Sequence, residues 1–182
     1  LLNQVEQRHL DTARQLIPIQ SQSSILSFIK MQCNEMEDIF NGIFLLKELS
    51  LRIKDKVMSY GELLSSKIIA AALESSNKVQ WVDSTQLIKT NSQYGYAQVN
   101  FDATDTNIQK YFKENDTLLY VASGFIASDE KNINTTLGRG GSDYSAAIYA
   151  SALHAKSMEI WTDVPGMMTA DPRLVPAAKT IA

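Results

Sequence analysis

A glycine-rich turn with two opposite charges is the part of the sequence whose residue types could do chemistry. The stretch TLGRGGSDYSAA places Arg139 and Asp143 around Gly140, Gly141 and Ser142, just ahead of an alanine-rich helical pattern. Free backbone N–H groups at a helix start attract anions, and a planar guanidinium binds a carboxylate or phosphate through two hydrogen bonds. The turn therefore predicts a site for a small anionic or zwitterionic ligand.

The same turn also has a purely structural explanation. Ser142 or Asp143 would cap the following helix, and the glycines would only make the chain turn tightly. The stretch matches neither the P-loop pattern G-x-x-x-x-G-K-[ST] nor a dinucleotide-binding G-x-G-x-x-G directly after a strand. Arg139 favours the ligand site, because a guanidinium in a glycine turn suits a carboxylate or phosphate better than it suits a cap.

The loop WTDVPGMMTADPR is a second candidate. Residues 164–167 fit a type II turn, and Asp171 with the following proline starts another. Thr162 and Asp163 would end a strand, and Arg173 would reach a phosphate from the same side. A surface loop held by two turns explains the pattern without any ligand, so both interpretations stay open.

Glu62 is a third candidate. It follows Gly61, where the sequence predicts a turn that leads into a helix. A glutamate at a helix start commonly does no more than interact favourably with the helix dipole. Its spacing alone therefore does not select a function.

The elements that must position these residues are helical at first and mixed later. Apolar stripes predict a helix that Pro18 stops and a second over about 25–46. Strands are predicted over 79–83, 116–123 and 156–163, with helices over about 103–114 and 142–155. Strands that alternate with helices favour a mostly parallel sheet covered on both faces, in one domain. Ligands of such sheets bind outside the carboxyl ends of the strands, where all three candidates fall.

Composition excludes several classes of protein. The 182 residues carry a net charge of −3 and no lysine or arginine cluster, which disfavours nucleic acid as a partner. No apolar run approaches the ~18 residues of a membrane span. Cys33 stands alone, so no intramolecular disulfide is possible, as is usual in the cytoplasm. His9 and His154 lie far apart in the sequence, which disfavours a zinc site.

Three segments together resemble the catalytic domain of the aspartokinases, in the order and spacing of that family. They are SYGELLSSKIIAAAL, SGFIASDEKNINTTLGRGGSDYSAA and WTDVPGMMTADPRLVPAAKTI. The similarity is close from about Met58 onward, particularly to the single-function, lysine-sensitive type. It implies the three-layer αβα fold of the amino acid kinases, with a mostly parallel sheet and no P-loop. Residues 1–182 would be a partial catalytic domain with a helical N-terminal portion.

The resemblance implies transfer of the ATP γ-phosphate to the side-chain carboxylate of L-aspartate. The product would be 4-phospho-L-aspartate, in the first step of lysine, threonine and methionine biosynthesis. By similarity, Arg139 would bind the α-carboxylate, with Ser142, Gly140 and Gly141 nearby, and would act with Asp143 as a catalytic residue. Glu62 and Asp143 would hold the α-ammonium group.

ATP would enter with Mg²⁺, without a metal site in the protein itself. Thr162 and Asp163 would lie against the nucleoside and Arg173 would reach the phosphates. Met168 stands where the family usually has a tyrosine, and would also lie at the nucleotide. The resemblance further implies a cytoplasmic homo-oligomer.

Two departures from the family matter for activity. The family's opening lysine strand, K-F-G-G-T/S, and its C-terminal regulatory domains are not in the sequence. We therefore expect the 182 residues alone to be inactive. Two alternatives stay open: another amino acid kinase, for glutamate, acetylglutamate or carbamate, and a non-catalytic ligand-binding module of the same fold.

Overall fold

The computed structural model describes residues 1–74, 77–115, 117–161, 166 and 168–181. Its helices are α1 (Leu2–Leu16), α2 (Gln22–Leu46), α3 (Leu51–Leu73), α4 (Ser84–Leu87), α5 (Phe101–Glu114) and α6 (Gly141–Ala152), with a short 3₁₀ turn at Ile19–Ser21. Its strands are β1 (Val79–Val82), β2 (Lys89–Thr90), β3 (Leu119–Ala122), β4 (Ile126–Asp129) and β5 (Asn134–Thr136). Within these ranges, no helix combines the length and apolarity that crossing a bilayer requires.

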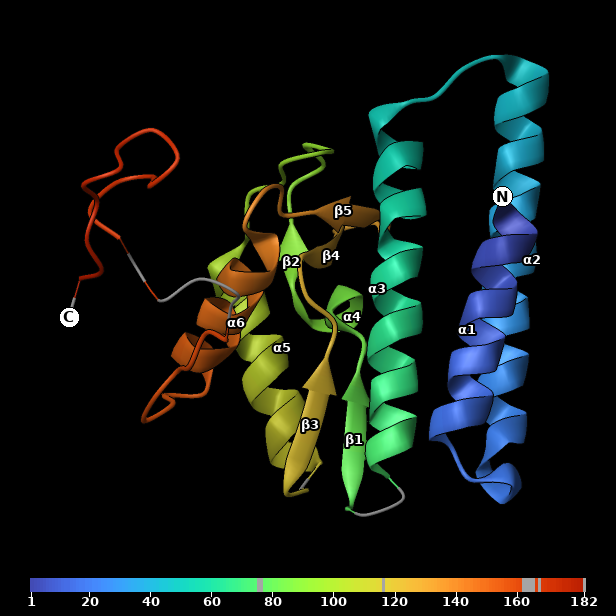
Figure 1. Ribbon diagram of the computed structural model, residues 1–182, viewed down its shortest axis with the longest axis horizontal. Coiled ribbons are helices and arrows are strands. Elements are labelled where there is room, and N and C mark those ends of the chain that lie inside the picture. The colour runs from blue at the N-terminus through green and yellow to red at the C-terminus, as the bar shows by residue number, and fades with distance from the viewer. Residues whose placement is uncertain (75–76, 116, 162–165, 167, 182) are drawn as a thin grey trace.

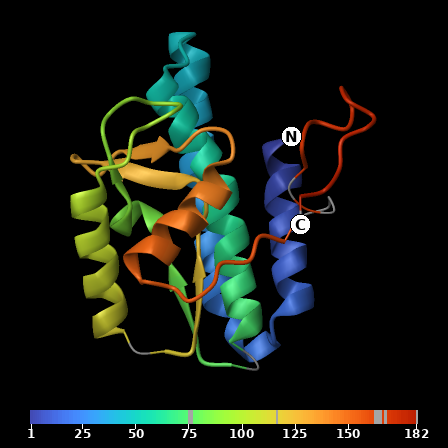
Figure 2. The same ribbon diagram turned by 90° about the vertical axis from the view of Figure 1, so that its left-hand side faces the viewer.

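The architecture is the expected three-layer αβα arrangement. Figure 1 shows β1 and β3 between α3 on one side and α5 and α6 on the other, with α1 and α2 beyond α3. The helical N-terminal portion is therefore the outer part of one helical layer. Figure 2, turned by 90°, shows α5 and α6 in front of the strands.

The helical layer forms because three amphipathic helices share one core. Pro18 follows α1 directly, as predicted, since its ring cannot continue a helix. Ile25 and Ile29 of α2 pack with Tyr60 and Leu64 of α3 in one buried cluster. The i, i+4 spacing of each pair places its two side chains on the same helix face.

The sheet is mostly parallel, as predicted, but it is divided into two small sheets. β1 pairs with β3 in parallel, with Val82 opposite Ala122. β2 pairs with β4 in parallel, and β4 pairs with β5 in antiparallel. A second buried cluster joins the strands to α5 and α6 through Val82, Ile108 and Ile148.

The predicted turn at Tyr60 and Gly61 is wrong, because α3 runs unbroken through both residues. The helix begins earlier, at Ser50, whose hydroxyl accepts a hydrogen bond from the Ile53 N–H at 3.3 Å. A glycine inside a helix costs about 1 kcal/mol, which tertiary packing readily overrides. Here Tyr60 and Leu64 are fully buried while Gly61 lies on the exposed face.

The predicted strand over 156–163 is not found in the described residues. Residues 156–161 form no strand and all are exposed, and 162–163 lie outside the described ranges. An alternating pattern is sufficient to suggest a strand, but a strand forms only beside a partner that supplies its hydrogen bonds. In Figures 1 and 2 this part of the chain follows α6 and leads to the C-terminal segment, which stands away from the helices and strands.

Candidate functional site

Glu62 lies in the middle of α3 and points at the end of β3. The N–H of Gly124, two residues after β3, donates a hydrogen bond of 2.6 Å to Glu62 Oε1. Among the described residues no hydrogen bond occupies the other oxygen, Oε2. The position also excludes the helix-start explanation of Glu62, since eleven residues of α3 precede it, Leu51 to Gly61.

Gly124 in turn lies against the start of α6. A Cβ on Gly124 would stand 2.9 Å from Ser142 Oγ, so only glycine allows this approach without a shift. One residue later, the N–H of Phe125 donates to Ser145 Oγ at 2.9 Å. These contacts bring Glu62 to the neighbourhood of Ser142, although the two residues are 80 positions apart in the sequence.

The glycine turn is shaped by close backbone packing as well as by its dihedral angles. Gly138 and Gly140 have backbone φ angles of 77° and 74°, which residues other than glycine rarely adopt. A Cβ on Gly138 would lie 2.3 Å from the Tyr96 ring, and one on Gly141 would lie 2.7 Å from Phe125 Cβ. The turn is therefore confined between the loop that carries Tyr96 and the residues that follow β3.

A shallow cavity of about 290 Å³ opens at this turn. Its lining consists of Met58, Phe125, Gly138, Gly140, Gly141, Ser142 and Asp143. Met58 lies one helical turn before Glu62 on α3, so the two side chains share a face. The cavity therefore has α3 on one side and the start of α6 on the other.

Arg139 and Asp143 are both exposed at this turn. No ion pair engages either side chain within the described part of the chain, so both charges are available to a ligand. Asp143 stands in the first turn of α6, where the N–H of Gly141 donates to the Gly138 carbonyl at 3.1 Å but those of Ser142 and Asp143 have no acceptor within the described residues. The arrangement offers one cation and two carboxylates, Glu62 and Asp143, around exposed backbone donors.

Asp55 holds the two sides of the site together and was not found by sequence reasoning. Its buried carboxylate accepts from the Thr136 hydroxyl at 2.9 Å and from the Thr136 N–H at 3.1 Å. It also accepts from the Gly95 N–H at 2.8 Å. Asp55 thus fixes α3 to β5, two residues before Gly138. Only its place four positions before the SYGE segment could have suggested a role.

Asp129 plays a similar part for the loop after β2. Its carboxylate accepts from the N–H groups of Lys131 and Ile133, both at 2.9 Å, and from the hydroxyls of Ser92 and Tyr94. Burial raises the pKa of Asp129, but these hydrogen bonds to the charged form outweigh it and leave the pKa below its usual value. The ionised carboxylate therefore stabilises the loop that packs on the glycine turn.

Of the expected nucleotide-side residues, Met168 and Arg173 are not brought to this turn. Thr162 and Asp163 lie outside the described residues. Met168 forms an isolated backbone bridge with Thr180 in the segment that stands away from the helices and strands (Figure 1). Arg173 is exposed and binds Asp171 through two hydrogen bonds, of 3.1 and 2.9 Å.

The chain is similar to known amino acid kinases along almost its whole length. The sequence profile described as "Amino acid kinase family" matches residues 3–182. Lysine-sensitive aspartokinase 3 of Escherichia coli K12 is 41% identical over 155 residues, covering 81% of this chain and 34% of that protein. A bifunctional aspartokinase/homoserine dehydrogenase 1 of Zea mays is 33% identical over 181 residues, covering 98% and 20%.

Solved structures agree with the sequence relatives. E. coli aspartokinase III in complex with aspartate and ADP superposes with a TM-score of 0.85 at 34% identity, covering 99% of this chain and 40% of that one. The Clostridium acetobutylicum aspartate kinase gives 0.62 at 26% identity, covering 86% and 31%. The chain thus spans about a third or less of the curated relatives named here. The resemblance to aspartokinases is confirmed, and the chain belongs to the amino acid kinase family.

Proposed function

We propose that this chain supplies the aspartate-binding part of an aspartate kinase, which transfers the ATP γ-phosphate to the side-chain carboxylate of L-aspartate. The observation that carries the proposal is the hydrogen bond from the Gly124 N–H to Glu62 Oε1. It brings a carboxylate from α3 to the glycine turn that starts α6. A zwitterionic amino acid requires both signs of charge at one place, and this turn has them.

The α-carboxylate and the α-ammonium group of the substrate would each have a matching group in this chain. Arg139 would bind the α-carboxylate through two parallel hydrogen bonds, with Ser142 close by. Glu62 Oε2 and Asp143 would accept from the α-ammonium group, while Glu62 Oε1 keeps its bond to Gly124. The backbone N–H groups around Gly140 and Gly141 favour the negative charge of a carboxylate.

This reaction requires that the substrate carboxylate is positioned and that the negative charge of the triphosphate is neutralised, and it does not require a general base. A carboxylate with an ordinary pKa of about 3.9 is already ionised at neutral pH, so no proton has to be removed before it attacks. The attacking oxygen and the triphosphate are both anionic, and cations must offset their repulsion. A site of arginine and backbone donors, without a Ser-His or Cys-His pair, is consistent with this chemistry.

ATP would enter as its Mg²⁺ complex. The cation would be held mainly by the phosphates, as Mg²⁺ commonly is at kinase sites. Thr162, Asp163 and Met168 would contact the nucleoside, and Arg173 would exchange Asp171 for a phosphate. The aspartate and ADP bound by the E. coli relative support this pair of ligands.

The test is an acyl-phosphate assay on the protein as its gene encodes it. Hydroxylamine traps an acyl phosphate as a coloured hydroxamate, and we expect colour with ATP and L-aspartate. L-Glutamate, N-acetyl-L-glutamate and carbamate serve as the comparison substrates. Colour with one of these and not with aspartate would show that another amino acid kinase is the correct assignment. The absence of colour with all four would indicate a non-catalytic module.

A further inference from the structure

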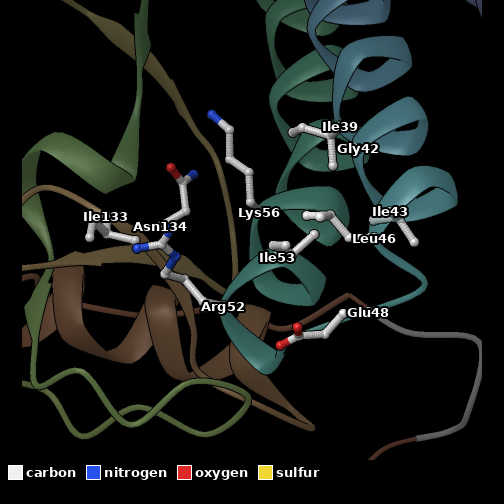
Figure 3. A pocket seen from close by; sticks show the side chains of 10 residues that line it. All are labelled: Ile39, Gly42, Ile43, Leu46, Glu48, Arg52, Ile53, Lys56, Ile133 and Asn134. Atoms are coloured by element: carbon white, nitrogen blue, oxygen red, sulfur yellow. The ribbon is translucent and has the colours of Figure 1, made fainter.

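A second, larger cavity lies at the N-terminal end of α3. It has a volume of about 480 Å³ and opens between the second half of α2, the first turns of α3 and the turn between β4 and β5. Figure 3 shows its lining side chains: Ile39, Gly42, Ile43, Leu46, Glu48, Arg52, Ile53, Lys56, Ile133 and Asn134. None of these residues lines the cavity at the glycine turn. Its volume lies in the range of small-molecule sites, roughly 300–1,000 Å³.

The walls of this cavity are aliphatic. Isoleucine and leucine side chains from α2, α3 and the β4–β5 turn face it together. Gly42 leaves room in the α2 wall, since a Cβ added there would meet no atom within 4 Å. Single exposed leucines are ordinary on protein surfaces, but a concave aliphatic surface built from three elements is typical of a binding site.

The two cations at this cavity, Arg52 and Lys56, differ in how they are paired. Lys56 is paired with Glu35 at 3.1 Å, whereas Arg52 forms no ion pair or side-chain hydrogen bond within the described residues. In Figure 3 the guanidinium of Arg52 reaches toward Ile133 and Asn134, and Gly42 and Ile43 lie on the opposite wall. A guanidinium above aliphatic walls matches a ligand with an apolar chain and an anionic head.

We propose that this cavity binds an aliphatic carboxylate. The hydrocarbon chain would lie against Ile43, Leu46 and Ile53, and the carboxylate would accept two hydrogen bonds from Arg52. A self-associated pair of chains is the competing explanation, and the sedimentation measurement below distinguishes the two. The proposal does not depend on the reaction at the glycine turn, and a binding measurement tests it directly.

The experiment measures binding of octanoate to the protein as its gene encodes it, by isothermal titration calorimetry, with 1-octanol as the uncharged comparison. We expect one saturable octanoate site. Arg52→Gln should weaken octanoate about tenfold and leave 1-octanol unchanged, since a charge-assisted hydrogen bond contributes about that factor. Arg8→Gln, an exposed arginine on α1, is the matched control and should change neither ligand.

Gly42→Leu tests the cavity itself. The added side chain should fill the space beside α2 and abolish binding of both ligands, while the melting temperature stays equal or rises. If G42L fails to fold, Ile133→Thr, which shortens and polarises the opposite wall, should weaken both ligands several-fold.

Several outcomes would overturn the proposal. They are the absence of saturable octanoate binding, equal affinity of the wild type and Arg52→Gln, and unchanged binding by a folded G42L. Sedimentation that shows a dimer which G42L disrupts would instead identify the cavity as an interface between copies.

Discussion

In the proposed aspartate site, the two carboxylate oxygens of Glu62 would have different tasks. Oε1 accepts from the Gly124 N–H at 2.6 Å, and Oε2 is left for a ligand within the described structure. The first task needs only an acceptor, whereas binding an ammonium group needs a negative charge. A glutamine separates the two tasks, because its amide oxygen still accepts from Gly124.

We therefore expect Glu62→Gln to raise the KM for aspartate at least tenfold with little change in stability. Losing a hydrogen bond to a charged group costs roughly 1.5–3 kcal/mol. Steady-state kinetics and a thermal melt of the same preparation measure both quantities. Glu37→Gln, at an exposed position of α2, is the control. A lower melting temperature with an unchanged KM would leave Glu62 with a structural role alone.

Ionisation of the single residue Asp129 should make the stability of the protein depend on pH. Its folded pKa is lowered, so its stabilisation is complete above the unfolded value of about 3.9 and is lost as the pH falls through the folded pKa. Asp129→Asn should lower the free energy of unfolding by roughly 1–3 kcal/mol at pH 7. The difference from the wild type should shrink progressively in acid.

Urea unfolding of wild type and variant across this pH range measures the effect. Glu130→Gln, an exposed neighbour in the same turn, should show no comparable difference. A constant difference between Asp129→Asn and the wild type at all pH values would mean that packing, and not the charge, is responsible.

At the scale of elements, the site depends on how closely the end of β3 approaches the start of α6. Gly124 and Gly141 permit this approach, whereas Gly61 on α3 serves no such purpose. A Cβ on Gly141 would lie 2.7 Å from Phe125 Cβ and 3.2 Å from Leu137 Cβ, and one on Gly61 would meet nothing within 4 Å. The same substitution should therefore have opposite effects at the two places.

Gly141→Ala should destabilise the protein by about 1–3 kcal/mol, because neighbouring backbone has to move. It should also weaken aspartate binding, since the turn that carries Arg139 shifts. Gly61→Ala should stabilise by about 0.5–1 kcal/mol, because alanine is the better helix former. Urea unfolding measures the free energy of unfolding of both variants. A Gly141→Ala variant that is more stable than the wild type would disprove the close contact at Gly141.

At the scale of the molecule, α3 joins the helical layer to the strands. Asp55 in the first half of α3 binds Thr136 of β5, and Trp81 of β1 contacts the second half of α3. The Trp81 indole N–H donates to Ser66 of α3 at 3.0 Å, and its ring meets Phe28 of α2 edge-on at 6.0 Å. Because α3 contributes to both sides, we expect the helices and strands to unfold together.

Asp55→Ala should lower the free energy of unfolding by at least about 2 kcal/mol, because it leaves the buried donors of Thr136 without an acceptor. Circular dichroism reports the helices, and Trp81 fluorescence reports their contact with β1. The fluorescence needs a Trp161→Phe background, since Trp161 is 91% exposed. Both signals should show one transition, shifted equally by Asp55→Ala.

Asp38→Ala, at an exposed position of α2, is the control for this variant and should shift neither signal. Two separate transitions in the wild type would contradict the shared role of α3. The helical layer and the strands would then be independent folding units.

The sequence by itself determined most of the longer helices, two of the parallel strands and the charged turn. These follow from local signals: apolar spacing, Pro18 after α1, and glycines on either side of Arg139. The motifs also sufficed to recognise the family, and most of the candidate aspartate site rests on them. Local patterns could not, however, distinguish a turn at Gly61 from a continuous helix, nor a strand over 156–163 from an unpaired extended segment.

Only the tertiary structure decided which distant groups meet. The contact of Glu62 with Gly124, the bonds of Asp55 to Thr136 and the packing of Tyr96 on Gly138 each join residues more than 40 positions apart. Such contacts depend on how α3, the strands and α6 pack, and no short segment encodes them. The cavity beside Gly42 has the same origin, because its walls come from three elements that converge only in the folded chain.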